Sequence, residues 1–129
     1  MPLAERYEVY AHTELAVARA QSSGSRVVAA GTSVVRALEG CRKHQGRLTP
    51  GRGFTDLRLG PESPLEVVDG LLTGLHEPGT SHFSLLEAFA PRWLLTRALD
   101  HAARSGYVQH EFGDSCLILA GALGTPAAA

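Results

Sequence analysis

The chain has 129 residues, of which 44% are hydrophobic and 19% are charged, and its formal net charge at pH 7 is −1. This length suits one domain with a single core, and the composition is that of a globular protein rather than a disordered one. A charge so close to zero argues against a protein that holds nucleic acid by bulk electrostatics, so any polynucleotide contact would have to be a local patch.

Neither export nor membrane insertion is indicated by the sequence. Residues 1–6 lack the basic and apolar regions of a signal peptide, and no apolar run approaches the roughly 20 residues that cross a bilayer. The two cysteines, Cys41 and Cys116, lie far apart within apolar patterns, as reduced buried thiols usually do. We therefore expect a cytoplasmic protein with no membrane partner.

The first third of the chain predicts a helix, a strand and a second helix. An alanine-rich run predicts a helix over about 12–22, ended by a Ser-Ser-Gly cluster. Residues 26–30 are short and apolar after the arginine, which is typical of a strand buried on both faces in a parallel sheet. The run after Gly31 predicts an amphipathic helix in which Arg36 and Glu39 can pair one turn apart.

The remaining elements follow from turn residues and apolar periodicity. Together they predict one α/β domain over residues 1–120, with a mainly parallel sheet flanked by helices. In order, we expect a mobile loop at 43–53, strands at 54–59 and 65–72, a short helix capped by Thr80 or Ser81, a helix at 92–105 after Pro91, a strand at 116–119 and a frayed tail at 121–129.

The turn Gly31-Thr32-Ser33 is the first candidate ligand site. It joins the end of the predicted strand to a helix, where open α/β sheets bind ligands because the first N–H groups of a helix attract anions. The glycine would admit a ligand, and the two hydroxyls could bind a carboxylate, ribose or phosphate. Plain helix capping by the hydroxyls explains the same residues equally well.

Histidines and carboxylates in polar turns form a second candidate site. Imidazole titrates near neutral pH, so such a cluster could carry out acid–base chemistry. No two of these histidines have the i, i+4 spacing of a zinc-binding helix, and we expect no metal. The residues are His76, His82, His110, Glu77, Glu111 and Asp114.

Several motifs, taken together and in order, resemble the S-adenosylmethionine:tRNA ribosyltransferase-isomerase family of queuosine biosynthesis. The resemblance covers about residues 4–120, but it matches only the carboxy-terminal part of enzymes that are more than twice as long. The motifs are Glu5–Val9, Arg26–Glu39, Val67–His76, Ser81–Ala90 and Tyr107–Leu119.

The resemblance implies an activity. The family enzyme transfers and isomerises the ribosyl group of its cosubstrate S-adenosylmethionine onto 7-aminomethyl-7-deazaguanine in tRNA, which forms epoxyqueuosine and releases adenine and methionine. The sulfonium acidifies the neighbouring C5′ hydrogens, so a general base is needed, and a proton donor helps adenine leave.

The resemblance also implies roles for single residues. His76 and Asp114 are the candidate catalytic residues, with His76 as base or acid. The candidate substrate-binding residues are Gly31, Thr32, Ser33, Arg36, Asp69, His82 and Gly113. Where the family pattern reads His-Leu-Pro-Lys-Ser-Thr, residues 76–82 lose the lysine and gain an acid and a second histidine. Losing that lysine would weaken phosphate attraction, which leaves room for a target other than the usual tRNA.

Three functions follow from these observations. The first is an enzyme that acts only with an amino-terminal half, supplied by a partner subunit or by a longer protein. The second is a module that binds S-adenosylmethionine or a nucleoside without turnover, and the third is a protein-interaction module. An interdomain face left uncovered would expose apolar surface, so we expect a homo-oligomer or a complex.

Overall fold

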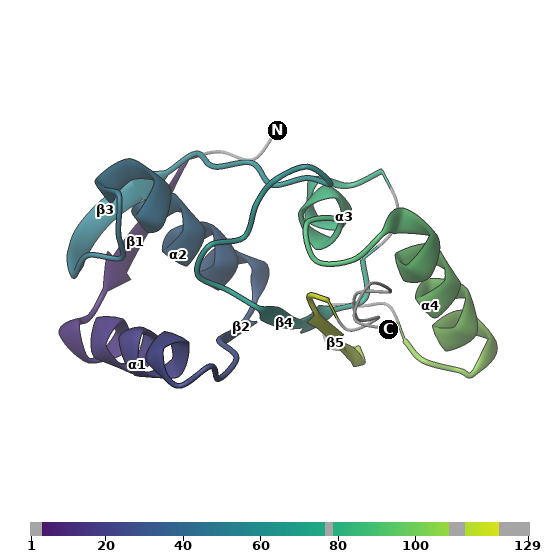
Figure 1. Cartoon of the computed structure of the whole chain (residues 1–129). Helices are drawn as coiled ribbons and strands as arrows, with labels where there is room; N and C mark the ends of the chain where they lie inside the picture. The colour runs from purple at the N-terminus through teal and green to yellow at the C-terminus, as the bar shows by residue number, and fades with distance from the viewer. Residues whose placement is uncertain (1–3, 77–78, 109–112, 122–129) are drawn as a thin grey trace.

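The computed structural model describes residues 4–76, 79–108 and 113–121 of the chain. Figure 1 shows the elements in chain order, with α1 and α4 towards opposite ends of the molecule. They are β1 (Glu5–Val9), α1 (Ala11–Ser22), β2 (Val28–Ala30), α2 (Thr32–Gln45), β3 (Gly51–Thr55), β4 (Gly70–Gly74), α3 (Ser81–Leu86), α4 (Arg92–Arg104) and β5 (Ser115–Leu119).

The strands form two small sheets in a mixed α/β fold. One sheet pairs β1 with β3 antiparallel, and the other has the order β2-β4-β5. Of these pairings only β2–β4 is parallel, because β5 returns antiparallel along β4. The α/β class is therefore confirmed, but the prediction of a mainly parallel sheet is wrong. An apolar run shows that a segment is a strand without showing its direction.

The β1–β3 sheet contains the largest error in the predicted elements. The sequence predicts a loop at 43–53 and a strand at 54–59, whereas β3 begins at Gly51 and ends at Thr55. Its glycines resemble loop signals, but Gly53 has a packing reason: a Cβ there would lie 2.5 Å from the hydroxyl oxygen of Tyr7 on the paired strand. The glycine lets the tyrosine ring lie over the strand.

The helices follow their sequence signals closely. Both α1 and α4 lie within one residue of their predicted ends, and α2 runs two residues beyond Lys43 to a left-handed Gly46. Of the two residues predicted as the cap of the short helix, Thr80 and Ser81, it is Thr80 whose side-chain oxygen accepts the N–H of Phe83, at 3.0 Å. Among the described residues, no helix is both long and apolar enough to cross a membrane.

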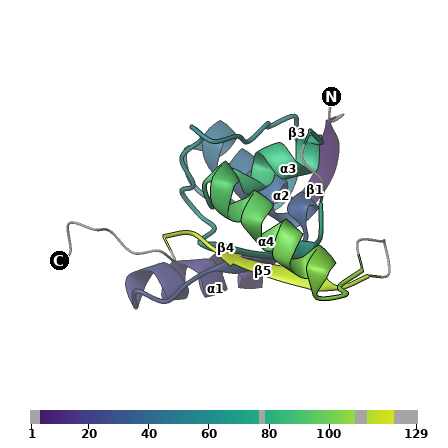
Figure 2. The ribbon, with the colours of Figure 1, turned by 90° about the vertical axis from the view of Figure 1, so that its right-hand side faces the viewer.

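The core lies between the β2-β4-β5 sheet and the helices α2, α3 and α4, which share one side of β4 and β5 in Figure 2. Its most deeply buried apolar side chains come from α2, β4, α3 and the segment just before β4: Val35, Cys41, Val68, Leu71 and Phe83. Cys41 and Cys116 are both free thiols, as predicted, although Cys116 is only half-buried.

Glu39 is a charged residue in this core, with only 4% of its surface exposed. Its carboxylate accepts the backbone N–H groups of Glu66, Val67 and Val68 at 2.8–2.9 Å. The predicted pairing of Glu39 with Arg36 does not occur. Arg36 pairs instead with Glu5 on β1, because tertiary partners offer both side chains better-satisfied bonds than the helix surface does.

The strand over residues 26–30 is shorter and less buried than predicted. Only Ala29 of β2 is buried, while Val28 is 47% exposed and Ala30 is also exposed. One face of β2 thus meets the core and the other meets solvent. The prediction of burial on both faces is wrong for this chain, because α2 covers only one side of the sheet.

Candidate functional site

The candidate residues gather mainly at one edge of the β2-β4-β5 sheet. Because β2 and β4 are parallel, both end at this edge, and the antiparallel β5 begins there. The N–H of Gly31 donates to the carbonyl of Leu72 at 2.9 Å, and Gly74 pairs with Ser115. We call residues 31–33, 74–76 and 113–115 the ligand edge, since open sheets bind ligands at the carboxyl ends of parallel strands.

The start of α2 forms one side of the ligand edge. Gly31 is its N-cap with φ of 102°, a conformation that favours glycine, and a Cβ at this position would meet no atom within 4 Å. No side-chain cap bond forms there, and the Ser33 hydroxyl donates instead to Glu5 at 3.1 Å. Capping by a side chain is therefore not what holds this turn, and the first N–H groups of α2 remain at the edge, where anions are favoured.

Arg36 lies one turn into α2 and is tied to the rest of the fold. Its guanidinium pairs with the carboxylate of Glu5, and its Nε donates to the carbonyl of Leu57 at 3.2 Å. These bonds join α2 to β1 and to the segment after β3. They also fix the direction of the arginine side chain.

His76 follows the central strand β4 and is the best-defined titratable group of the ligand edge. Its Nε2 lies 2.8 Å from the hydroxyl oxygen of Thr73, and its ring centroid lies 4.8 Å from that of His82 on α3. Burial lowers the pKa of His76 below its ordinary 6.5, and the neighbouring His82 lowers it further. The imidazole is therefore neutral at pH 7 and able to accept a proton.

Asp114 stands beside the start of β5, next to Gly113. Its Oδ2 accepts the N–H of Val108 at 2.7 Å, and its own N–H donates to the carbonyl of Val108 at 3.0 Å. This pair of bonds joins the segment after α4 to the start of β5. The carboxylate is thereby held at the same edge as His76.

Asp69 stands apart from the other candidates. It precedes β4, so it lies at the opposite edge of the sheet, four residues and about 13 Å along the strand from Thr73. Its Oδ2 accepts the N–H of Val27 at 2.8 Å, and its own N–H donates to the carbonyl of the same residue at 2.7 Å. These bonds hold β4 against β2 where the two strands begin.

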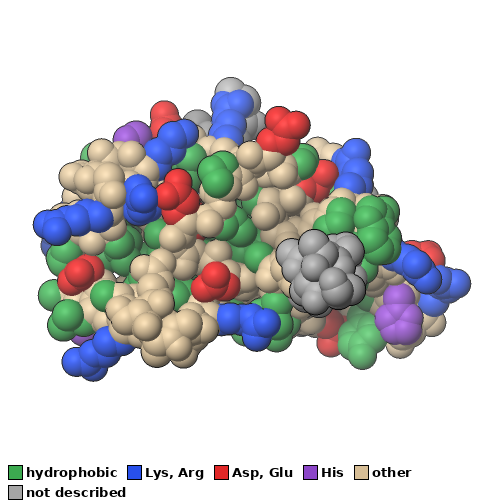
Figure 3. All heavy atoms as spheres, in the orientation of Figure 1, with side chains coloured by type: hydrophobic (Ala, Val, Ile, Leu, Met, Phe, Trp, Pro, Cys, Tyr) green, Lys and Arg blue, Asp and Glu red, His purple; other side chains and the backbone are tan. Residues whose placement is uncertain are grey.

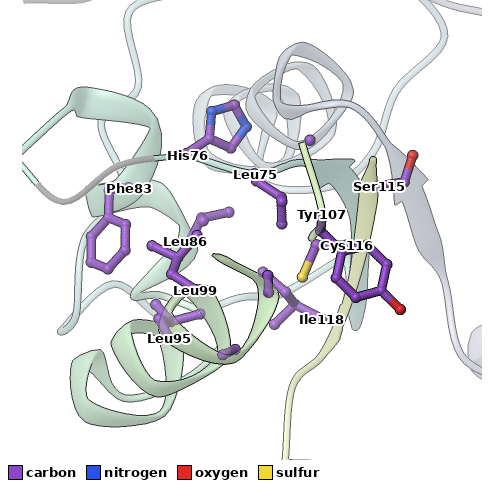
Figure 4. A pocket seen from close by; sticks show the side chains of 13 residues that line it. Leu75, His76, Phe83, Leu86, Leu95, Leu99, Tyr107, Ser115, Cys116 and Ile118 are labelled. Carbon is purple, nitrogen blue, oxygen red and sulfur yellow. The ribbon is translucent and has the colours of Figure 1, made fainter. Parts of the chain in front are cut away.

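A cavity of about 210 Å³ opens beside His76 between α3, α4 and β5. Figure 4 shows leucines of the two helices on one side of it and residues of β5 on the other. Burial raises the pKa of the Cys116 thiol at its wall, so this cysteine is protonated and a poor nucleophile at neutral pH. The labelled lining residues include Leu86, Leu95, Leu99, Tyr107, Cys116 and Ile118.

Sequence reasoning missed Thr73 and the cavity. A threonine within an apolar strand, three residues before a histidine, was the available signal for Thr73. The cavity had none, because its walls come from β4, α3, α4 and β5, and only the tertiary structure brings these elements together. His110, Glu77 and Glu111 of the predicted cluster lie outside the described residues, and those that are described include no group of three metal-ligating side chains.

On the face shown in Figure 3, the charged side chains of the described residues form no large patch of a single sign. Figure 3 shows basic and acidic side chains interspersed over the visible face. This mixture agrees with the net charge of −1 and with a polynucleotide contact that is local rather than general.

Known proteins resemble the chain in both sequence and structure. The family model described as "Queuosine biosynthesis protein" matches residues 2–118. An S-adenosylmethionine:tRNA ribosyltransferase-isomerase of Pelobacter propionicus is 39% identical over 88% of this chain and 33% of its own length. One from Acidithiobacillus ferrooxidans is 43% identical over 89% of this chain and 33% of its own length.

The crystal structure of an S-adenosylmethionine tRNA ribosyltransferase from Thermotoga maritima superimposes with a TM-score of 0.77 at 33% identity. The match covers 88% of this chain and 40% of that one. The chain thus spans about a third of the length of the curated relatives named above. With nearly its whole length matched in sequence and in structure, the chain belongs to the queuosine biosynthesis protein family.

Proposed function

We propose that this chain forms part of the active site of an S-adenosylmethionine:tRNA ribosyltransferase-isomerase, and that the rest of the site comes from a further polypeptide portion. The reaction is transfer and isomerisation of the ribosyl group of S-adenosylmethionine onto 7-aminomethyl-7-deazaguanine in tRNA. The observation that carries the proposal is a neutral, oriented His76 at the same sheet edge as the Gly31 turn. The names of the relatives support the substrates.

His76 is the proposed general base. If its Nε2–H donates to the Thr73 oxygen, the lone pair lies on Nδ1, which takes the proton from C5′ beside the sulfonium. The C–H electron pair then stays on C5′, where the adjacent positive sulfur stabilises it, and the imidazole becomes imidazolium. A lowered pKa keeps the base unprotonated at pH 7 before the step.

The remaining edge residues have binding roles in this proposal. The first N–H groups of α2, with Thr32 and Ser33, bind a polar or anionic part of the cosubstrate or of the flipped base, and Gly31 allows its close approach. Asp114, held through Oδ2, offers Oδ1 to a ligand hydroxyl or to the departing adenine.

Three of the candidate residues act mainly through others. Arg36 keeps α2 in place through Glu5, and any contact that it makes with the ligand shares the guanidinium with that carboxylate. His82, on α3, lowers the pKa of His76, and both histidines are placed to contact the ligand. Asp69 enters the proposal as the residue that aligns β2 with β4 rather than as a ligand-binding one.

The cavity beside His76 supplies apolar surface for a ring of the substrate. Its volume of about 210 Å³ can accommodate a nucleobase, and its walls are mostly aliphatic. We assign it to a purine-like ring, with the reacting carbon at the mouth beside His76. This arrangement would keep water away from the acidified C5′.

The test is adenine release by the chain combined with the rest of the family protein, using tRNA that carries 7-aminomethyl-7-deazaguanine. We expect His76→Gln to lower the turnover rate by roughly 10²–10⁴-fold while S-adenosylmethionine binding persists. His101→Gln on the exposed side of α4 is the matched control and should turn over as the parent does.

Two results would contradict the proposal in different ways. If His76→Gln turns over at the parent rate, His76 is not the general base. Binding of S-adenosylmethionine by the combined protein without any adenine release would favour the alternative, a module that binds the nucleoside without turnover.

A further inference from the structure

The β2-β4-β5 sheet has one face buried in the core and a second, outer face that meets solvent. The register places Ala30, Leu72 and Leu117 in one row across the three strands, on the outer face. Leu72 is 43% exposed and Leu117 is 58% exposed, whereas the alternate residues Leu71 and Ile118 are buried. Leucines exposed on a sheet face lose the stabilisation that burying their side chains would give.

The outer face continues into a second row of the same kind. A Cβ on Gly70 would lie 2.8 Å from the Leu119 side chain and 3.3 Å from that of Val28, so both side chains flank the glycine on this face. Val28 itself is 47% exposed. Among the described residues the outer face therefore carries no charged side chain; it consists of Val28, Ala30, Gly70, Leu72, Gly74, Ser115, Leu117 and Leu119.

Helix α1 lies on the side of the outer face without covering it. In Figure 2, α1 lies on one side of β4 and β5, and α2, α3 and α4 lie on the other. Within α1 only Val17 is buried, and Leu15 is 53% exposed. The outer face and α1 thus lie on the same side of the sheet, and both leave apolar side chains exposed.

The chemistry of the outer face limits what can cover it. Without charged groups it has nothing to attract phosphates, so nucleic acid is disfavoured. Val28, Leu72 and Leu117 together expose on the order of 300 Å², whereas a stable complex buries about 800 Å² per partner. Contacts with these three side chains alone would fall short of that area, so a stable occupant must also contact surface around them.

The solved relative indicates an occupant of that kind. This chain matches only 40% of the Thermotoga maritima protein, with a TM-score of 0.77, and the rest of that protein is a polypeptide attached to the same fold. A larger portion of protein can cover the sheet and also contact α1. It would cover the outer face with apolar side chains rather than with charged ones.

We propose that the outer face of the β2-β4-β5 sheet, together with α1, is the docking surface for the remaining polypeptide portion of the family protein. The covering segment places an apolar surface over Leu72 and Leu117 and extends beside α1. This proposal shares with the proposed function only the requirement for the remaining polypeptide portion. Its test is separate, because docking is measured without cosubstrate or tRNA. It assigns an assembly role to strands that also carry the ligand edge.

The experiment compares thermal unfolding of this chain alone with the same chain fused to the rest of the Thermotoga maritima protein. Leu72→Lys and Leu117→Lys should lower Tm by roughly 5–10 °C in the fusion, because each buries an unpaired ammonium, and by less than about 2 °C in the chain alone. Trp93→Lys, at a 55% exposed position on α4, is the matched control and should be mild in both.

A second measurement keeps the test decisive if the fusion does not fold. Lysine is placed at the positions of the Thermotoga maritima protein that align with Leu72, Leu117 and Trp93, and Tm is recorded. A lower Tm for lysine at the first two positions, but not at the third, supports the proposal. Equally small changes in Tm at all three positions overturn it. It is also overturned if this chain sizes as a dimer that Leu117→Lys dissociates while the fusion tolerates the change, since the occupant is then a second copy.

Discussion

Replacing Glu39 tests whether a buried carboxylate holds the segment that leads into β4. Its Oε2 accepts the N–H groups of Val67 and Val68, and its Oε1 accepts that of Glu66. Glu39→Gln keeps the shape and one acceptor oxygen, but it turns an NH₂ group towards a backbone donor. One buried N–H then loses its partner, which costs about 1–3 kcal/mol, and the bonds that survive lose their charge assistance.

The alanine variant sets the upper limit of the effect. Glu39→Ala leaves all three N–H groups without the carboxylate, so we expect a loss of at least about 3 kcal/mol, a large part of the 5–15 kcal/mol typical of a domain. Urea unfolding followed by far-UV circular dichroism measures both variants.

Glu66→Gln serves as the control, because its carboxylate is half exposed and pairs with Arg42 at the surface. It should change stability by less than about 1 kcal/mol. If Glu39→Gln unfolds at the same urea concentration as Glu66→Gln, the carboxylate does not anchor this segment and the reasoning fails.

Two further predictions concern His76 and the packing of α2. Because burial is the larger cause of its lowered pKa and His82 the smaller, His82→Asn should raise the pKa of His76 while leaving it below 6.5, as read from an NMR titration of the ring. If the His76 pKa is the same in His82→Asn as in the parent chain, His82 does not lower it. In the parent chain the lowered pKa of His76 stabilises the folded state above pH 6.5, and this stabilisation is lost as the pH falls towards the pKa of the folded state. Gly40→Ala should cost about 1–3 kcal/mol, because its Cβ would lie 2.2 Å from the Thr55 hydroxyl oxygen and 2.7 Å from its Cβ. Gly74→Ala, with no atom within 4 Å of the new Cβ, is the matched control, and equal midpoints for the two variants in urea would contradict the packing account.

The candidate site was predictable where its signals are local. The Gly31 turn follows a strand and begins a helix, as the sequence predicts, and His76 lies two residues after the end of β4, within the family motif. The roles of both remain proposals. Asp69 and Asp114 belong to equally clear motifs, but the sequence does not show that they lie at opposite edges of the sheet. That separation follows from the directions and register of the strands.

The sequence by itself determined the helices, the Thr80 cap, the α/β class and the resemblance to the family, because capping residues, apolar periodicity and ordered motifs are properties of neighbouring residues. Tertiary structure alone decided the direction of β5, the pairing of the glycine-rich β3 with β1, and the bonds of Glu39 to residues 66–68. It also decided that Val28 and Leu72 face solvent. These features depend on which segments distant in the chain meet, and burial on one face or on two is fixed by what packs against a strand rather than by the apolar residues within it.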